Sequence, residues 1–453
     1  MGIYAVPISL LLFGVIVCVE TLRQKPRCRI DFLLPVSVMF IVLFCVIPLY
    51  LLFFYFSKNA GAGFWIFKNS LDDVVFLVAS LASLSGYLAI IFGYYFKNIL
   101  HRGRGVGRCS DVTINSVEKK IEIKNKNLLI IGIILGCLGS IALFFYAYSI
   151  GGVAIMIELA AAFRGSEPPV ISRFAFLKNV APLVIVSSYF FFAIIKSSST
   201  RMMLFFSRVF FVITFFLSLI ILFHQSGRLY LITYLFIFPI AQMMRDNKLN
   251  YKLIIVGSIL FFLFILLGKE GFHFFIDPDS FFDKADTFSS NPISIVSNML
   301  NEFTFPYVTL ANTIKVVPVD IMYRWFMDIP ISVVYLLPQR LLDLKDLPPT
   351  VTMLNVEQFG APIPVDLLSF SYFSMGFPGV LIVCFVYGFM LRVFDRMLPS
   401  NGEYIFVIFR AAWIMFFATN VMYGNPHHAL VGGFSLFIAT AILLFISRRR
   451  SLL

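Results

Sequence analysis

Charged side chains are scarce in this chain. Only 13% of its 453 residues are charged, whereas 60% are hydrophobic. Average soluble domains carry about 25% charged residues, so this composition excludes a soluble globular domain. Cysteine is also scarce, and none of the six cysteines falls in a predicted external loop, so no disulfide framework is expected. No internal repeat, heptad series or Gly-rich phosphate loop occurs, which leaves ATP-driven chemistry without support.

What the chain has instead is a series of apolar runs. A helix needs roughly 20 residues to cross about 30 Å of hydrocarbon, and most of the runs approach or exceed that length. Because a chain in lipid must satisfy its backbone internally, these runs predict an all-α helical bundle. We expect about 11 membrane-spanning helices. They are Ile3–Val19, Phe32–Phe56, Val74–Tyr95, Leu128–Ile150, Val180–Ile195, Met202–Phe223, Leu229–Met244, Leu253–Leu267, Phe370–Leu391, Ile405–Met422 and Leu430–Ile446. The apolar segment Ile331–Leu342 leaves this count open by one.

One long polar interruption divides the chain into three parts. Residues 1–268 hold the first eight predicted helices, residues 269–369 form a long loop rich in acids, proline and aromatics, and residues 370–453 hold the last three helices. Within the loop, Asn291–Val317 is predicted to be a helix that lies on the bundle, and Met327–Leu342 to rest at the membrane surface. Lipid-buried helices need no such elaboration, so the loop marks the face where binding or chemistry is expected.

The positions of lysine and arginine predict the orientation. Most of the 36 basic residues lie in connectors on one side of the expected bundle, which is therefore cytoplasmic. The N-terminus then lies outside and the C-terminus inside, and the long loop is extracytoplasmic, where acids outnumber bases. Because the basic residues are spread over separate connectors, the net charge of +12 reflects membrane orientation, and no nucleic acid is expected as a partner.

A few arginines are expected on the outer side, where orientation gives no reason for them. An arginine near hydrocarbon costs a few kcal/mol unless it is paired, and its planar fork matches phosphate oxygens. Arg164, Arg173, Arg228 and Arg340 are therefore candidates to bind an anionic group attached to a lipid. The alternative, which also applies to Arg324, is that each pairs with a loop acid or with ordinary lipid headgroups.

Two residues are candidates for the catalytic base. Asp366 falls just before the ninth predicted helix, at the membrane surface, and His224 shares a short turn with Arg228. A histidine can act as a base near neutral pH. Glu302 and Glu357 are further alternatives for the base. For His224 the competing interpretation is an interfacial histidine that is hydrogen-bonded to the backbone.

Other polar residues have simpler interpretations. His273, His427 and His428 are also expected at the outer face, but the adjacent pair His427-His428 lacks the i, i+4 spacing of two ligands on one helix face, so no metal site is predicted. Arg208 and Arg410 fall within two turns of the cytoplasmic ends of their helices, where long side chains can extend to the interface.

Four short segments resemble the Wzy-type O-antigen polymerases, which join oligosaccharide repeat units at bacterial inner membranes. They are Ala161–Gly165, Ser226–Arg228, Tyr335–Arg340 and the glycine motif Phe373–Gly379. The chain departs from the pattern in one respect. Related ligases carry a histidine, and many polymerases a glutamate, shortly before the first glycine of that last motif. Val365 and Phe370 occupy the corresponding positions here, with Asp366 nearby.

The resemblance implies a GT-C-like lipid-linked glycosyltransferase plan in the bacterial inner membrane. It implies glycosyl transfer at the periplasmic face between undecaprenyl-pyrophosphate-linked oligosaccharides, with the lipid bilayer and a chain-length regulator as further partners and no cofactor. Arginines would hold the departing pyrophosphate and a base would take the acceptor proton. Arg164, Arg228 and Arg340 suit the first role, with Arg173 in reserve, and Asp366 or His224 the second.

Two other functions remain open. A repeat-unit flippase or other transporter would carry charges within its spans and paired halves, whereas these spans are nearly free of charge and one loop is long. An O-antigen ligase would share the whole plan and differ only in its acceptor. We favour the polymerase.

Overall fold

The computed structural model describes residues 4–23, 30–55, 73–102, 125–156, 174–197, 200–224, 228–247, 252, 255–257, 259, 300–334, 364–399 and 402–451. All regular elements in these ranges are helices, and no strand occurs in them. The helices are α1 (Ala5–Leu22), α2 (Leu33–Phe40), η1 (Ile41–Val46), α3 (Ile47–Tyr55), α5 (Asp73–Arg102), α6 (Asn125–Ser149), η2 (Ala175–Asn179), α8 (Leu183–Ser197), α9 (Arg201–His224), α10 (Arg228–Asp246), α14 (Phe305–Val316), α15 (Asp328–Val334), α17 (Leu367–Met397), α18 (Tyr404–Met422) and α19 (Pro426–Ser451).

Nine helical segments in the described ranges are long and apolar enough to cross a membrane. They are α1, the continuous α2–η1–α3 segment, α5, α6, η2 with α8, α9, α17, α18 and α19. Each coincides with a predicted span, so the chain is a polytopic, all-helical membrane protein. The predicted span Leu229–Met244 corresponds to α10, whose more polar last turn leaves it outside this set of nine. The predicted span Leu253–Leu267 lies mostly outside the described residues, so the total of eleven stays a prediction.

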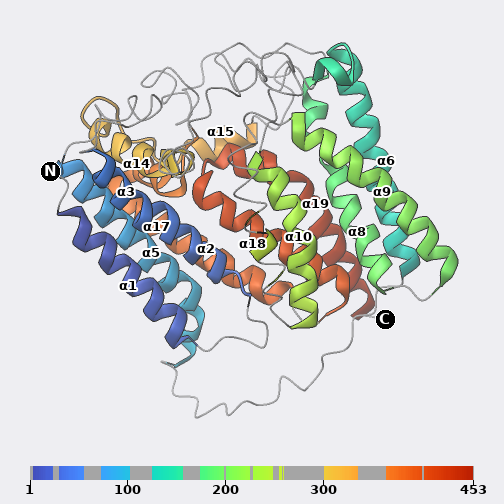
Figure 1. Ribbon diagram of the computed structural model, residues 1–453, viewed down its shortest axis with the longest axis horizontal. Coiled ribbons are helices and arrows are strands. Elements are labelled where there is room, and N and C mark those ends of the chain that lie inside the picture. The colour runs from blue at the N-terminus through green and yellow to red at the C-terminus, as the bar shows by residue number, and fades with distance from the viewer. Residues whose placement is uncertain are drawn as a thin grey trace.

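The helices are arranged with α18 at the centre of the bundle. Figure 1 shows α1, α2, α3 and α5 on one side, α6, α8 and α9 on the other, and α10, α17, α18 and α19 between them. In its membrane-crossing window 89% of α18 is buried, against 22% for α1 and for α9. The outer helices therefore turn apolar side chains outward, as helices that face lipid do.

The two ends of the bundle differ in character. We call the end that carries α14 and α15 the loop end, and the opposite end, where Arg23, Arg245 and Arg396 lie, the basic end (Figure 1). The chain begins near the loop end and α19 finishes at the basic end, as the predicted alternation of the helices requires. Which end faces the cytoplasm stays a prediction.

Part of the predicted long loop is packed into the bundle. In α14, Pro306 to Thr313 are all buried. The hydroxyl of Tyr307 donates to the carbonyl of Phe76, 3.0 Å away, and lies 2.8 Å from the Ser80 hydroxyl on α5. The predicted helix within Asn291–Val317 is thus confirmed for the part that α14 covers.

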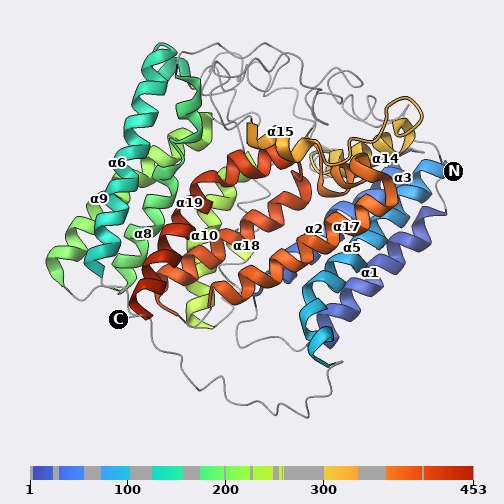
Figure 2. The ribbon, with the colours of Figure 1, turned by 180° about the vertical axis from the view of Figure 1, so that it is seen from behind.

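Helix α17 is broken close to its start. Met375 and Gly376 have non-helical backbone angles, and Gly376 has φ +65°. A broken helix leaves carbonyl groups without helical partners. Here the loop before α15 donates hydrogen bonds to two of these carbonyls. The Arg324 N–H donates to the Phe373 carbonyl at 3.1 Å, and the Trp325 N–H to the Ser374 carbonyl at 2.9 Å. Figure 2 shows the longer second part of α17 running from the region of α14 toward the basic end.

The prediction that Arg410 extends to the interface is wrong. Arg410 is only 3% exposed, and its guanidinium forms an ion pair with Asp395 of α17. It also donates to the carbonyls of Asp395 and Leu398, at 2.9 and 2.6 Å. Since these carbonyls lie at the end of α17, Arg410 closes that helix from the neighbouring α18. Arg208, by contrast, is exposed on α9.

Candidate functional site

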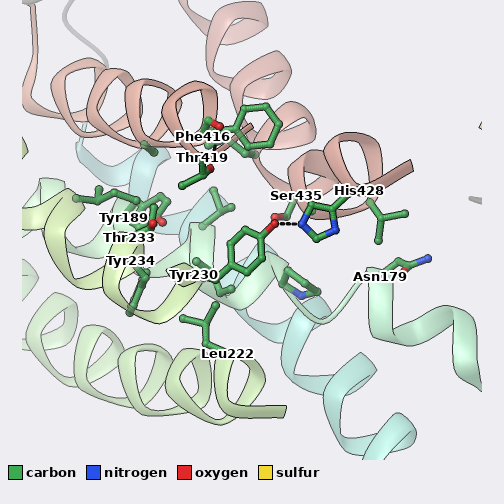
Figure 3. Close-up of a pocket in the computed structure, with 18 of the residues that line it drawn as sticks. Asn179, Tyr189, Leu222, Tyr230, Thr233, Tyr234, Phe416, Thr419, His428 and Ser435 are labelled. Atoms are coloured by element: carbon green, nitrogen blue, oxygen red, sulfur yellow. Dashed lines mark hydrogen bonds between the residues drawn. The ribbon is translucent and has the colours of Figure 1, made fainter. Parts of the chain in front are cut away.

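A cavity of about 270 Å³ lies between six helices near the loop end (Figure 3). Its walls come from η2 and α8, from α9 and α10, and from α18 and α19. The lining residues are Lys178, Asn179, Pro182, Ile185, Val186, Tyr189, Leu222, Tyr230, Thr233, Tyr234, Ile237, Ala412, Phe416, Thr419, His428, Val431, Gly432, Ser435 and Leu436. The cavity thus combines an aliphatic and aromatic wall with a small number of polar groups, as ligand sites commonly do.

The polar groups are concentrated toward one end of the cavity. Lys178 and Asn179 end η2 just before α8, and Tyr230 and His428 lie in the first turns of α10 and α19, all at the loop end. The aliphatic residues come mainly from deeper turns. Deeper in the wall, Thr233 is only 7% exposed, and its hydroxyl has no hydrogen-bond partner among the described residues. Since buried polar atoms in proteins nearly always have a partner, this hydroxyl indicates a position for a polar group of a ligand.

A histidine is held in this wall by two tyrosines. The hydroxyl of Tyr230 on α10 is hydrogen-bonded to Nε2 of His428 on α19 (Figure 3). The ring of Tyr423 lies 5.3 Å from the imidazole at an interplanar angle of 32°. Tyr423 itself contacts Phe305 of α14, at 5.6 Å between ring centroids. The imidazole orientation is therefore fixed by contacts from several parts of the fold.

Asp366 lies at the start of α17 and is fully buried. Its Oδ1 accepts hydrogen bonds from the N–H groups of Leu368 and Ser369, at 2.9 and 3.1 Å, and its Oδ2 accepts one from the Ser369 hydroxyl. This is the arrangement of a helix N-cap. Burial raises the pKa of the Asp366 carboxyl to about 7, although these hydrogen bonds act in the opposite direction. Asp366 does not line the cavity.

His224 is the last residue of α9 and is 3% exposed. Its Nδ1 lies 2.7 Å from the Met156 carbonyl, and its Nε2 lies 3.0 Å from the Tyr146 hydroxyl. A carbonyl accepts only, so Nδ1 carries the proton and Nε2 accepts from Tyr146. Both ring nitrogens are thus engaged in holding α9 against α6 and the segment after it. Like Asp366, His224 is absent from the cavity wall.

The predicted anion-binding arginines are mostly beyond the described residues. Arg164, Arg173 and Arg340 lie outside them, and for Arg228 the structure describes the backbone at the first position of α10, two residues before Tyr230. Arg324 pairs with Asp328 at 2.7 Å, where the two side chains are 10% and 1% exposed. For Arg324 the alternative of a pairing with a loop acid is therefore confirmed.

Several residues of the cavity were not predicted from the sequence. Tyr230 and Thr233 lie in the predicted span Leu229–Met244, and Lys178 lies just before the predicted span Val180–Ile195. His428 was expected only to lie at the outer face. The available signal was a polar residue within one or two turns of a predicted outer helix end. Among the described residues, no group of three or more His, Cys, Asp or Glu side chains is placed to hold a metal ion.

The site combines a lysine, a histidine–tyrosine pair and a hydroxyl without a partner among the described residues with an apolar wall. Such a wall suits an amphipathic ligand with an anionic end, and the histidine–tyrosine pair can move a proton. Comparison of the chain with protein-family models, with curated proteins and with solved structures finds no match.

Proposed function

We propose that the chain polymerises O-antigen-type surface polysaccharide, by glycosyl transfer between undecaprenyl-pyrophosphate-linked repeat units at the periplasmic face of a bacterial inner membrane. The observation that carries this proposal is the cavity at the loop end. Its polar end holds Lys178, Asn179 and His428, while its wall is apolar. A substrate that joins a sugar and a pyrophosphate to a lipid has the same division of polar and apolar parts.

The size of the cavity supports a site for the reacting end of such a substrate. Small-molecule sites commonly span about 300–1,000 Å³, and this cavity of about 270 Å³ lies just below that range. It therefore accommodates roughly one sugar and its attached phosphate, with the carrier chain and the remaining sugars outside. Arg228 begins the helix that carries Tyr230 and Thr233, which suits a role in neutralising the phosphates.

The resemblance of four segments to Wzy-type polymerases, named above, supports the polymerase over a general lipid-binding protein. The long loop supports it over a transporter, since its described parts pack into the bundle through α14 and cap the broken α17. A fixed structure of this kind suits a site that holds two substrates in place.

A deletion strain distinguishes the three candidate functions. Loss of a polymerase leaves lipid A core capped by a single repeat unit. Protein expressed from a plasmid then restores the ladder of polysaccharide chain lengths seen on a gel. Loss of a ligase leaves bare core with polymer still on the carrier, and loss of a flippase leaves unpolymerised units on the inner leaflet. Either of these last two results would replace the proposal.

The role of the arginines has its own test in the same strain. We expect Arg164→Gln and Arg228→Gln to reproduce the deletion phenotype while the protein stays at normal levels in the membrane. The exposed Arg208→Gln on α9 is the matched control and should restore the ladder. Wild-type ladders from both of the first two variants would exclude their binding of pyrophosphate.

A further inference from the structure

We propose that Tyr230 and His428 form the proton relay that activates the acceptor hydroxyl in the cavity. This inference rests on the proposed function and assigns the base within it. The two residues come from different helices, α10 and α19, and both line the cavity. Their hydrogen bond joins the Tyr230 hydroxyl to Nε2 of His428 at the cavity wall (Figure 3).

The two bases expected from the sequence are less suited to this role. Both oxygens of Asp366 accept hydrogen bonds at the start of α17, and both ring nitrogens of His224 are engaged by Met156 and Tyr146. Neither residue lines the cavity. A general base must come within hydrogen-bond reach of the proton it takes, directly or through one intermediary, and among the three candidates His428 meets this condition.

The surroundings of His428 favour the neutral, proton-accepting form of the imidazole. His428 lies in the first turn of α19, where the positive end of the helix dipole disfavours an additional positive charge. Lys178 lines the same cavity from η2. With the proton of the neutral ring on Nδ1, Nε2 accepts from Tyr230.

The relay step balances in protons and electrons. The acceptor hydroxyl oxygen bonds to the anomeric carbon of the donor sugar as the bond from that carbon to the pyrophosphate oxygen breaks. The pyrophosphate leaves with the bonding electron pair. The hydroxyl proton passes to the Tyr230 oxygen while the Tyr230 proton passes to Nε2 of His428. The imidazolium then releases its Nε2 proton to water, which restores the starting tautomer.

The cavity also offers a way to orient the acceptor. The Thr233 hydroxyl lies one helical turn after Tyr230 on α10, so both side chains fall on the same face of that helix. Since the Thr233 hydroxyl is buried without a partner among the described residues, a second sugar hydroxyl can bond to it while the reacting hydroxyl contacts Tyr230.

The test uses purified full-length protein in nanodiscs, with lipid-linked repeat units extracted from the deletion strain as substrate. We expect His428→Gln and Tyr230→Phe each to lower the polymerisation rate by about 100-fold or more. Because the two residues act as one unit, the double variant should be no slower than the slower single variant. Losses that multiply in the double variant would overturn the relay, as would a His428→Gln rate within a few fold of the wild type.

Two further readouts separate proton transfer from structure and from binding. Added imidazole should restore part of the rate of His428→Ala and none of that of Tyr230→Phe; absence of restoration in His428→Ala counts against the relay. Binding of undecaprenyl pyrophosphate should be unchanged in both single variants, and a loss of binding that equals the loss of rate would reassign the pair to substrate binding.

The matched control is His427→Gln, which alters the neighbouring histidine outside the cavity wall and should keep nearly the full rate. Failure of this inference differs from failure of the proposed function. If wild-type protein extends no lipid-linked oligosaccharide, the function itself is wrong. If the wild type is active and His428→Gln is equally active, the function stands and the relay alone is wrong.

Discussion

At the scale of single residues, Asp366 is a buried acid that caps the start of α17 and has a shifted pKa. Its carboxyl satisfies N–H groups that α17 leaves without helical partners. Complete burial also disfavours its charged form, which raises its pKa to about 7. A residue of this kind looks like a catalytic base in a sequence, because an acid at a membrane surface is rare. Its geometry instead matches a cap that stabilises the first turn of a broken helix.

Asp366→Asn separates these two roles and carries a pH signature. The folded carboxyl holds its proton up to a pH of about 7, whereas the unfolded one releases it near 3.8. Between these values the folded state binds more protons, so the stability that this group contributes falls as the pH rises and is lost above the folded pKa. Asparagine caps about as well as aspartate and does not titrate. We therefore expect a flatter pH profile for the variant.

The measurement is thermal unfolding in detergent from about pH 5 to about pH 8, compared between wild type and Asp366→Asn. Parallel profiles would contradict the raised pKa. Asp366→Ala serves as the contrasting variant: it does not titrate either, but loss of the cap should place its stability about 1–2 kcal/mol below that of Asp366→Asn at every pH. Polymerisation by Asp366→Asn should remain near the wild-type rate, since the carboxyl lies outside the cavity wall.

At the scale of elements, the break in α17 depends on one glycine. Gly376 has φ +65° and ψ −146°, a backbone conformation that residues with a Cβ rarely adopt. A Cβ on this residue would also lie only 3.0 Å from the Tyr323 hydroxyl. The segment that holds Tyr323 is the same one whose Arg324 and Trp325 cap the first part of the helix. The glycine and the capping loop therefore form one structural unit.

We predict that Gly376→Ala lowers the stability of the protein by about 1–3 kcal/mol, through backbone strain and contact with Tyr323. Gly14→Ala in α1 is the matched control, because no atom lies within 4 Å of its would-be Cβ, and alanine is the better helix former. The measurement is the unfolding temperature of each variant in detergent, which should fall for Gly376→Ala and not for Gly14→Ala. Equal temperatures for the two variants would show that the left-handed conformation at Gly376 is not required.

The spans could be predicted from the sequence because their signal is local. The apolar stretch Phe370–Leu391 needs only length and composition to be recognised, and it falls within α17. The break at Gly376 is different, since it exists only together with the loop that caps it, more than forty residues earlier in the chain. Arg410 makes the same point. Its position near a helix end suggested exposure, but its partner Asp395 lies on another helix.

At the scale of the whole molecule, the cavity arises from helices that are far apart in the sequence. Lys178, Tyr230 and His428 come together only when η2, α10 and α19 meet at the loop end. No sequence spacing connects these three residues, so the sequence does not reveal that they share one cavity. The arginines had the opposite difficulty. They were recognised by their chemistry, whereas Arg164, Arg173 and Arg340 lie outside the described residues.

The orientation of the bundle decides whether the cavity meets substrates delivered outside the cytoplasm. In a cysteine-free background, Val319→Cys at the loop end and Arg201→Cys at the basic end offer two exposed positions, of which Val319 is 80% exposed. A membrane-impermeant maleimide should label Val319→Cys in intact spheroplasts and Arg201→Cys only after permeabilisation, because basic connectors stay in the cytoplasm. The reverse pattern would place the cavity on the cytoplasmic side. A polymerase of flipped repeat units would then be excluded, whatever the chemistry of Tyr230 and His428.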